Sequence, residues 1–200
     1  LAATWRITAN FPPNQNHGIA PIFVRNYDGH STSFSIKSVT DEQGKPLEHS
    51  WNGNELRIGD KDTYVRGEKT YIIKFTQRDV TKHYKDTGRD EFYWDVIGNE
   101  WRVPMENVRV SMKLDRSLQA AQRGELFCYV GRYGSTKRCD VSGDKGETVT
   151  NVRRLNRREG ITMAVGFNSG TFAEYQESLV ERLIKIWAMV QIPASILAVI

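Results

Sequence analysis

Apolar and polar residues alternate along most of this chain. The clearest case is the segment 107–114, in which every second residue is apolar. Successive side chains of a strand point to opposite faces, so strict alternation predicts a half-buried strand. The residues expected to face the core here are Val108, Val110, Met112 and Leu114. Their polar neighbours should then face solvent.

Similar strand patterns recur along the chain, separated by turn-forming residues. They cover residues 5–11, 19–24, 33–39, 56–58, 70–78, 91–96, 107–114, 147–153 and 161–167. Asn52-Gly53 lies between apolar residues, which is a strong hairpin signal. No pattern of helix length separates these strands. We therefore predict a mainly β fold, an antiparallel two-sheet β-sandwich of about nine strands, followed by a C-terminal helix.

The C-terminal end of the chain changes character. Residues 186–200 are almost entirely apolar, and Trp187 lies near their start. As a helix, this run would extend about 22 Å, less than the roughly 30 Å of a bilayer core. We predict that residues 183–200 begin a transmembrane helix, with Trp187 at the headgroup level. The alternative is a buried helix docked on the β-domain.

A polar segment precedes this apolar run. Thr171 and Glu174 have the spacing of a capping box, which predicts a helix start. The predicted organisation is a β-sandwich domain over residues 1–170, a helical linker over residues 171–182 and the membrane helix after it.

Composition and charge add one local feature. The formal net charge is +4. Much of it comes from four arginines that lie close together, with a single glutamate beside them. These are Arg153, Arg154, Arg157 and Arg158. They form either a solvated turn between two strands or a contact with an anionic surface, such as lipid headgroups or a wall polymer. No nucleic-acid module is present, so we expect no nucleic-acid partner.

Two cysteines, Cys128 and Cys139, enclose a segment rich in turn-forming residues. A hairpin between them would bring the sulfur atoms together as a disulfide. Such a bond requires an oxidising compartment, which favours an extracytoplasmic location. The alternative is two separate buried thiols. No histidine stands at ligand spacing from either cysteine, so we predict no metal site and no cofactor.

The sequence contains no catalytic motif that we can identify. Asp90, Glu91 and Asp95 lie beside aromatic residues, and paired carboxylates could act on a glycan. Carboxylates are also common at strand ends, and we expect no enzyme. The four histidines, at positions 17, 30, 49 and 83, lie in or beside turns. We expect them to be ordinary loop residues.

The tryptophans offer a second binding hypothesis. Trp51, Trp94 and Trp101 fall on or beside predicted strands, where such residues are usually core anchors. If they were exposed on one face, they could instead stack on sugars. A carbohydrate-binding module for cell-wall glycan is therefore an alternative function.

Several segments together resemble a known family. They are residues 11–19, 56–60, 71–75 and 93–101, and Gly166-Phe167 before the apolar tail. The most specific part is Tyr93-Trp94 followed by Gly98-Asn99-Glu100-Trp101. The chain resembles the N-terminal region of the bacterial predicted membrane proteins classed as domain of unknown function 2207 (YciQ-like).

This resemblance implies an architecture and no active site. Family members look like a secretion signal, an extracytoplasmic β-domain, transmembrane helices and a low-complexity tail. The chain would then be the β-domain and the start of the following helix, with a first strand and a signal upstream. We expect a non-catalytic domain in the cell membrane, on the extracytoplasmic side. Its partners would be membrane lipid through the C-terminal helix, and other envelope proteins or wall polymer.

Overall fold

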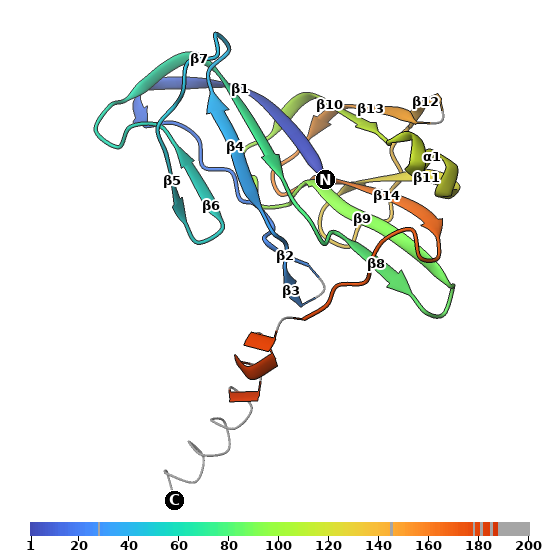
Figure 1. The fold of residues 1–200 in the computed structure, drawn as a ribbon. Helices are drawn as coiled ribbons and strands as arrows, with labels where there is room; N and C mark the ends of the chain where they lie inside the picture. Colours follow the sequence, from blue (N-terminus) through green and yellow to red (C-terminus); the bar gives the residue numbers. More distant parts are fainter. Residues whose placement is uncertain (28, 145, 178, 181, 185, 188–200) are drawn as a thin grey trace, which may run out of the picture.

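The computed structural model describes residues 1–27, 29–144, 146–177, 179–180, 182–184 and 186–187 (Figure 1). The strands are β1 (Ala2–Asn16), β2 (Asn26–Tyr27), β3 (His30–Ser31), β4 (Ser35–Thr40), β5 (His49–Asn52), β6 (Glu55–Ile58), β7 (Val65–Thr76), β8 (Thr81–Tyr84), β9 (Arg89–Ile97), β10 (Met105–Lys113), β11 (Gln122–Gly131), β12 (Ser142–Asp144), β13 (Glu147–Leu155) and β14 (Gly160–Asn168). A short helix, α1 (Arg116–Ala121), precedes β11. The prediction of a mainly β, antiparallel fold is confirmed.

The first half of the chain forms one three-stranded sheet and two short hairpins, of which one joins β2 to β3. The sheet has the order β1-β7-β4, and the other hairpin joins β5 to β6. Trp51 pairs with Leu56 in this hairpin, and Gly53 in its turn has φ of 59°. The predicted Asn-Gly hairpin is therefore present. The buried side chains of this half form one cluster, namely Phe11, Phe23, Val39, Leu56, Ile58, Tyr71, Ile73 and Phe75.

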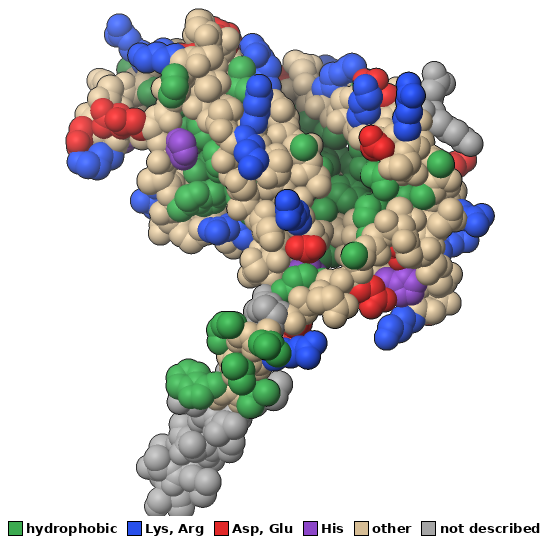
Figure 2. Space-filling model, viewed as in Figure 1, with side chains coloured by type: hydrophobic (Ala, Val, Ile, Leu, Met, Phe, Trp, Pro, Cys, Tyr) green, Lys and Arg blue, Asp and Glu red, His purple; other side chains and the backbone are tan. Residues whose placement is uncertain are grey.

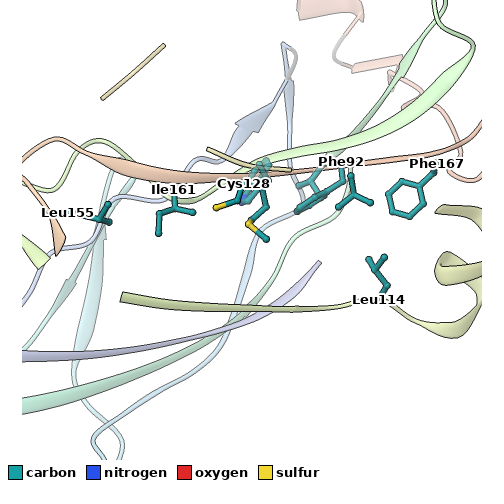
Figure 3. Close-up of a cluster of buried hydrophobic side chains, with 10 residues drawn as sticks. Phe92, Leu114, Cys128, Leu155, Ile161 and Phe167 are labelled. Carbon is teal, nitrogen blue, oxygen red and sulfur yellow. The ribbon is translucent and has the colours of Figure 1, made fainter. Parts of the chain in front are cut away.

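The second half is a two-sheet sandwich. One sheet has the order β11-β14-β9-β8 and the other has the order β10-β13-β12. Figure 3 shows side chains of both sheets meeting in the core between them. The inward residues predicted for segment 107–114 are confirmed: Val108, Val110 and Met112 of β10 pack against the core, and Leu114, which follows β10, is buried. The core residues labelled in Figure 3 are Phe92, Leu114, Cys128, Leu155, Ile161 and Phe167.

Two clusters of buried residues therefore lie within residues 1–170. The two-sheet description applies to the second half, whereas in the first half a sheet packs on a hairpin and on residues 19–24 (Figure 1). The described residues contain fourteen strands, more than the nine expected, because several of them span only two to four residues. Alternation reveals which face of a strand is apolar, but it does not reveal which sheets those faces bring together.

Two glycines explain why two segments of the first half lie so close. Gly18 packs against Ile58, the residue before Gly59, and Gly59 packs against His17, the residue before Gly18. Their φ angles are 142° and 133°. A Cβ on Gly18 would lie 1.8 Å from the carbonyl oxygen of Ile58. A Cβ on Gly59 would lie 1.9 Å from that of His17. Only glycine permits this crossing, which closes the cluster beside the β5–β6 hairpin.

The joint between the two halves is polar and buried. Gln77 follows β7 and is only 2% exposed. Its side-chain amide donates to the Val24 carbonyl at 2.7 Å and to the Thr32 hydroxyl at 3.0 Å. Across the joint, the ring of Tyr27 packs against that of Trp94 at 5.6 Å. Satisfied buried hydrogen bonds fix the geometry here because leaving them unmade would be costly.

The C-terminal segment projects away from the β-sheets (Figure 1). Residues 179–180, 182–184 and 186–187 are helical. Their apolar side chains are exposed, including Leu179 at 76% and Trp187 at 65% (Figure 2). Within the described part of the chain, no helix is long and apolar enough to cross a membrane. Most of the transmembrane helix predicted for residues 183–200 lies outside the described residues.

Candidate functional site

One end of the second sandwich is formed by three loops that a single side chain ties together. These loops are residues 98–104, 131–138 and 156–159, and we call them the three-loop end. The Asn99 side-chain amide donates to the Gly131 carbonyl at 2.9 Å and to the Arg158 carbonyl at 3.2 Å. The Arg158 N–H donates to the Trp101 carbonyl at 2.8 Å. The three backbones are therefore held in contact.

The first residue of β14 makes this contact possible. A Cβ on Gly160 would lie 2.3 Å from the carbonyl oxygen of Ile97 and 3.2 Å from the Asn99 amide nitrogen. A side chain at this position would force β14 and the 98–104 loop apart. The Gly-Asn-x-Trp segment that carried the family resemblance thus has a structural role, because its asparagine connects the loops.

The three-loop end is strongly basic. Its basic residues are Arg102, Arg132, Lys137, Arg138, Arg157 and Arg158, and its acidic residues are Glu100 and Glu159. The resulting net charge equals the +4 of the whole chain. All six basic residues are exposed. Within the described residues, none of them forms an ion pair. The Glu159 carboxylate accepts hydrogen bonds from the backbone N–H and the side-chain amide of Asn156.

The predicted arginine cluster is only partly reproduced here. Arg157 and Arg158 lie in the turn between β13 and β14, within the three-loop end. Arg153 and Arg154 lie on β13, and Arg154 pairs with Glu106 of β10 at 2.9 Å. The sequence pattern did not indicate the other four basic residues, Arg102, Arg132, Lys137 and Arg138, which are distant in the chain. Their neighbouring glycines and the hairpin-like spacing of the cysteines were the only local signals.

A disulfide stands beside this end of the molecule. The structure joins Cys128 of β11 to Cys139, with a Cα–Cα distance of 5.2 Å. The Cys139 N–H also donates to the Cys128 carbonyl at 3.0 Å, so the loop that carries Arg132 closes as a hairpin. Cys128 is buried in the second core. The cysteine pair expected from the sequence is thus at disulfide distance.

The three tryptophans proposed for sugar stacking do not share a surface. Trp94 is 7% exposed and belongs to the second core, so no sugar can stack on it. Trp51 is 38% exposed and packs against Phe23 and Phe34 of the first cluster. Trp101 is half-buried in the three-loop end. Their spacing in the sequence gave no information on this separation.

The three carboxylates of β9 point to different faces. Asp90 faces inward and is 2% exposed, whereas Glu91 and Asp95 lie on the outward face. The Asp95 carboxylate accepts a hydrogen bond from the Thr162 hydroxyl. These residues therefore do not form the facing pair that the glycan-hydrolase alternative requires.

Asp90 anchors the segment that leaves the last strand. Its carboxylate lies 2.7 Å from Nδ1 of His83 and accepts a hydrogen bond from the Phe172 N–H at 3.0 Å. Burial by itself would raise the pKa of Asp90, but the Phe172 N–H, the His83 ring and the Thr171 backbone hold that pKa below its usual value. The expectation that His83 is an ordinary loop histidine is wrong, because this residue lies in β8 and contacts a buried carboxylate.

A second histidine contributes to the same anchor. The His30 ring stacks on Tyr175 with centroids 3.9 Å apart, and its Nε2 lies 3.0 Å from the Asp79 carbonyl oxygen. A hollow of about 420 Å³ lies between these residues and the C-terminal segment. In the described part of the chain, no group of histidines, cysteines and carboxylates could hold a metal ion.

With this geometry established, the comparisons with known proteins give one match. A family model described as the N-terminal domain of a predicted membrane protein, DUF2207, matches residues 1–167. The chain belongs to this family. No curated protein and no solved structure matches the chain. The resemblance found in the sequence is therefore confirmed, and the DUF2207 family is one of predicted membrane proteins whose function is unknown.

Proposed function

We propose that this DUF2207 domain is a non-catalytic binding domain of a membrane-anchored envelope protein, located outside the cytoplasm. Its ligand is a phosphate-bearing anion, either a wall polymer or a lipid headgroup, which binds at the three-loop end. One observation carries this proposal: Arg102, Arg132, Arg157 and Arg158 come from three loops locked together by Asn99, and they have no carboxylate partner within the described residues. Arginine pairs with phosphate through two parallel hydrogen bonds.

The location outside the cytoplasm is supported by the cysteines. Cys128 and Cys139 stand at disulfide distance, and disulfides persist in oxidising compartments. Attachment to the membrane is supported by the family, which is one of predicted membrane proteins, and by the exposed apolar residues of the C-terminal segment. An apolar surface of this kind favours burial in lipid or in another envelope protein.

A role in binding rather than catalysis is supported by the spacing of the carboxylates. Glu91 and Asp95 share the outward face of β9 but are four residues apart. Four residues of a strand span about 13 Å, whereas glycosidase pairs are separated by about 5 to 9.5 Å. Asp90 is buried, and it is already bound by His83 and Phe172. No two of these three carboxylates therefore face each other as a glycosidase pair does.

The anion proposal is tested with the intact protein in neutral nanodiscs. One arm measures binding to poly(glycerol phosphate), and the other measures binding to phosphatidylglycerol vesicles. We expect binding in one arm, weakened at least tenfold when Arg102, Arg132, Arg157 and Arg158 are changed together to Gln, and weakened also by salt. The matched control changes four exposed basic residues of the first half to Gln, namely Lys37, Lys45, Arg66 and Lys69.

The outcomes of this experiment separate the two ligand sources. Binding in the polymer arm alone identifies a wall polymer, and binding in the vesicle arm alone identifies a lipid headgroup. Equal loss of binding in the control variant would show that only net charge matters. That result, or no binding in either arm, overturns the proposal.

The side of the membrane is tested separately. Protease added to intact protoplasts should digest the β-domain of the full-length protein. Digestion only after lysis would place the domain in the cytoplasm, and complete recovery without detergent would remove the membrane anchor.

A further inference from the structure

The sheet β11-β14-β9-β8 has an outward face that the core does not use. Strand β9 directs Phe92 and Trp94 inward, so Glu91, Tyr93 and Asp95 lie on the other side. Strand β14 directs Ile161, Met163, Val165 and Phe167 inward. Its outward residues are therefore the small ones, Thr162, Ala164 and Gly166. The centre of the outward face thus carries little side-chain bulk.

Aromatic rings stand on both sides of this centre. The register places Ala164 between Phe127 of β11 and Tyr93 of β9, and Thr162 between Tyr129 and Asp95. The rings of Tyr93 and Tyr129 are 6.4 Å apart at 37°, and those of Phe127 and Tyr129 are 6.5 Å apart at 29°. Residues directly opposite in antiparallel strands are close neighbours. We call Tyr93, Phe127 and Tyr129 the aromatic face.

The aromatic face is partly open to solvent, and Ala164 at its centre is buried between the rings. Tyr93 is 44% exposed, and Phe127 and Tyr129 are half-buried. The guanidinium of Arg138 lies 4.6 Å above the Phe127 ring and covers one border of the face. The shallow angles between the rings give neighbouring rings similar orientations, so a flat molecule could lie against more than one of them.

Two carboxylates, Glu91 and Asp95, share the outward face of β9 with Tyr93, and Lys82 of β8 is the cross-strand neighbour of Glu91. Burial raises the pKa of the Tyr93 hydroxyl, and the carboxylates of Asp95 and Glu91 raise it further. Burial also raises the pKa of the Glu91 carboxyl. Within the described residues, this carboxylate has no hydrogen bond or ion pair. A partly desolvated carboxylate without a partner gains from a ligand that brings an N–H or O–H donor.

We propose that the aromatic face binds a chain of N-acetylated amino sugars. The apolar face of a pyranose ring can stack on Tyr93 and Tyr129, and the acetamido N–H can donate to the unpartnered Glu91 carboxylate. The acetamido methyl group adds apolar contact with the rings. This site borders the three-loop end at Arg138, but it does not use the four arginines proposed to bind the anion.

The test is calorimetric titration of the intact protein with the hexamer of N-acetylglucosamine. We expect binding that weakens at least tenfold in Tyr93→Ala and in Tyr129→Ala. Tyr133→Ala and Tyr64→Ala are matched controls, because these tyrosines are 93% and 54% exposed and lie in loops outside β9 and β11. Glu91→Gln keeps the size of the side chain and should also weaken binding, even if a tyrosine variant fails to fold.

A second ligand tests the chemistry of recognition. Cellohexaose has the same linkage without the acetamido group and should bind at least tenfold more weakly. Equal affinity for both sugars would overturn the assignment, as would the absence of binding to the amino-sugar hexamer. Tighter binding to an RNA homopolymer that depends on Tyr93 would overturn it as well. The four-arginine variant should bind the hexamer normally, so failure of the anion proposal can be distinguished from failure of this one.

Discussion

The Asp90 carboxylate accepts a hydrogen bond from the backbone N–H of Phe172, with an oxygen–nitrogen distance of 3.0 Å. Asp90 lies at the start of β9, and Phe172 follows the last strand, so this bond joins the β-domain to the segment that leads to the C-terminal helix. The Phe172 ring packs edge-on against Phe167 of the core, with centroids 5.1 Å apart. Together with the His30–Tyr175 stacking, these contacts attach the β-domain to that segment.

The first prediction concerns the pH dependence of stability. The pKa of Asp90 is lowered in the folded protein, so its carboxylate stabilises the fold above the unfolded-state pKa of about 3.9, and this contribution is lost as the pH falls through the folded-state pKa. At pH 7, Asp90→Asn should lower the free energy of unfolding by about 1 to 3 kcal/mol. Urea unfolding between pH 7 and pH 2.5 measures the difference, which should shrink below about pH 4.

The matched control for this titration is Asp86→Asn, because Asp86 is exposed in the turn between β8 and β9. The control should unfold as the wild type does at every pH. A destabilisation of Asp90→Asn that stays constant down to pH 2.5 would mean that the carboxylate charge is not the cause.

The second prediction is that Cys128 and Cys139 are oxidised in the mature protein. The bond closes a short loop, and the chain-entropy relation for twelve residues gives a stabilisation of about 2.8 kcal/mol. Reduction, or the double change Cys128→Ala with Cys139→Ala, should lower stability by a similar amount. Intact mass after alkylation, with and without prior reduction, measures the pairing. Two alkylated thiols in the untreated sample would contradict it.

The third prediction concerns the inward face of β10. Val110 packs against the second core, so Val110→Asp places a charge against apolar side chains and should cost several kcal/mol. Ser111→Asp is the control, since Ser111 is the next residue and is exposed. The melting temperature should fall by more than about 5 °C in Val110→Asp and should stay unchanged in Ser111→Asp. Equal melting temperatures for the two variants would mean that the register is wrong.

The fourth prediction concerns Gly160. Gly160→Ala would place a Cβ 2.3 Å from the Ile97 carbonyl oxygen, so the start of β14 must move. We expect a loss of about 1 to 3 kcal/mol and weaker anion binding, because the three loops separate. Gly98→Ala is the control, since its Cβ would meet nothing within 4 Å. Chemical denaturation measures the stability, and the anion titration measures the binding. If Gly160→Ala had wild-type stability and wild-type affinity, the close approach of Gly160 to Ile97 would not be needed to hold the three loops together.

The sequence indicated some local features because their causes are local. The alternation in residues 107–114 indicated which side of β10 is buried, and the structure has Leu114 in the core. The Asn52-Gly53 turn fixed a hairpin, since its backbone conformation suits few other residues. Each of these depends on residues that are neighbours in the chain.

The tertiary structure alone decided how distant residues meet. Nothing local to Asn99 predicts hydrogen bonds to Gly131 and Arg158, which are 32 and 59 residues away. Trp94 is buried and Tyr93 is exposed because only one face of β9 meets the second sheet, and the local sequence does not show which face that is. The sequence by itself determined the β class, the hairpins, the family and the apolar C-terminal run. Strand pairing across long separations determined the sites, because a period of two shows that a strand has two faces but not what lies opposite each of them.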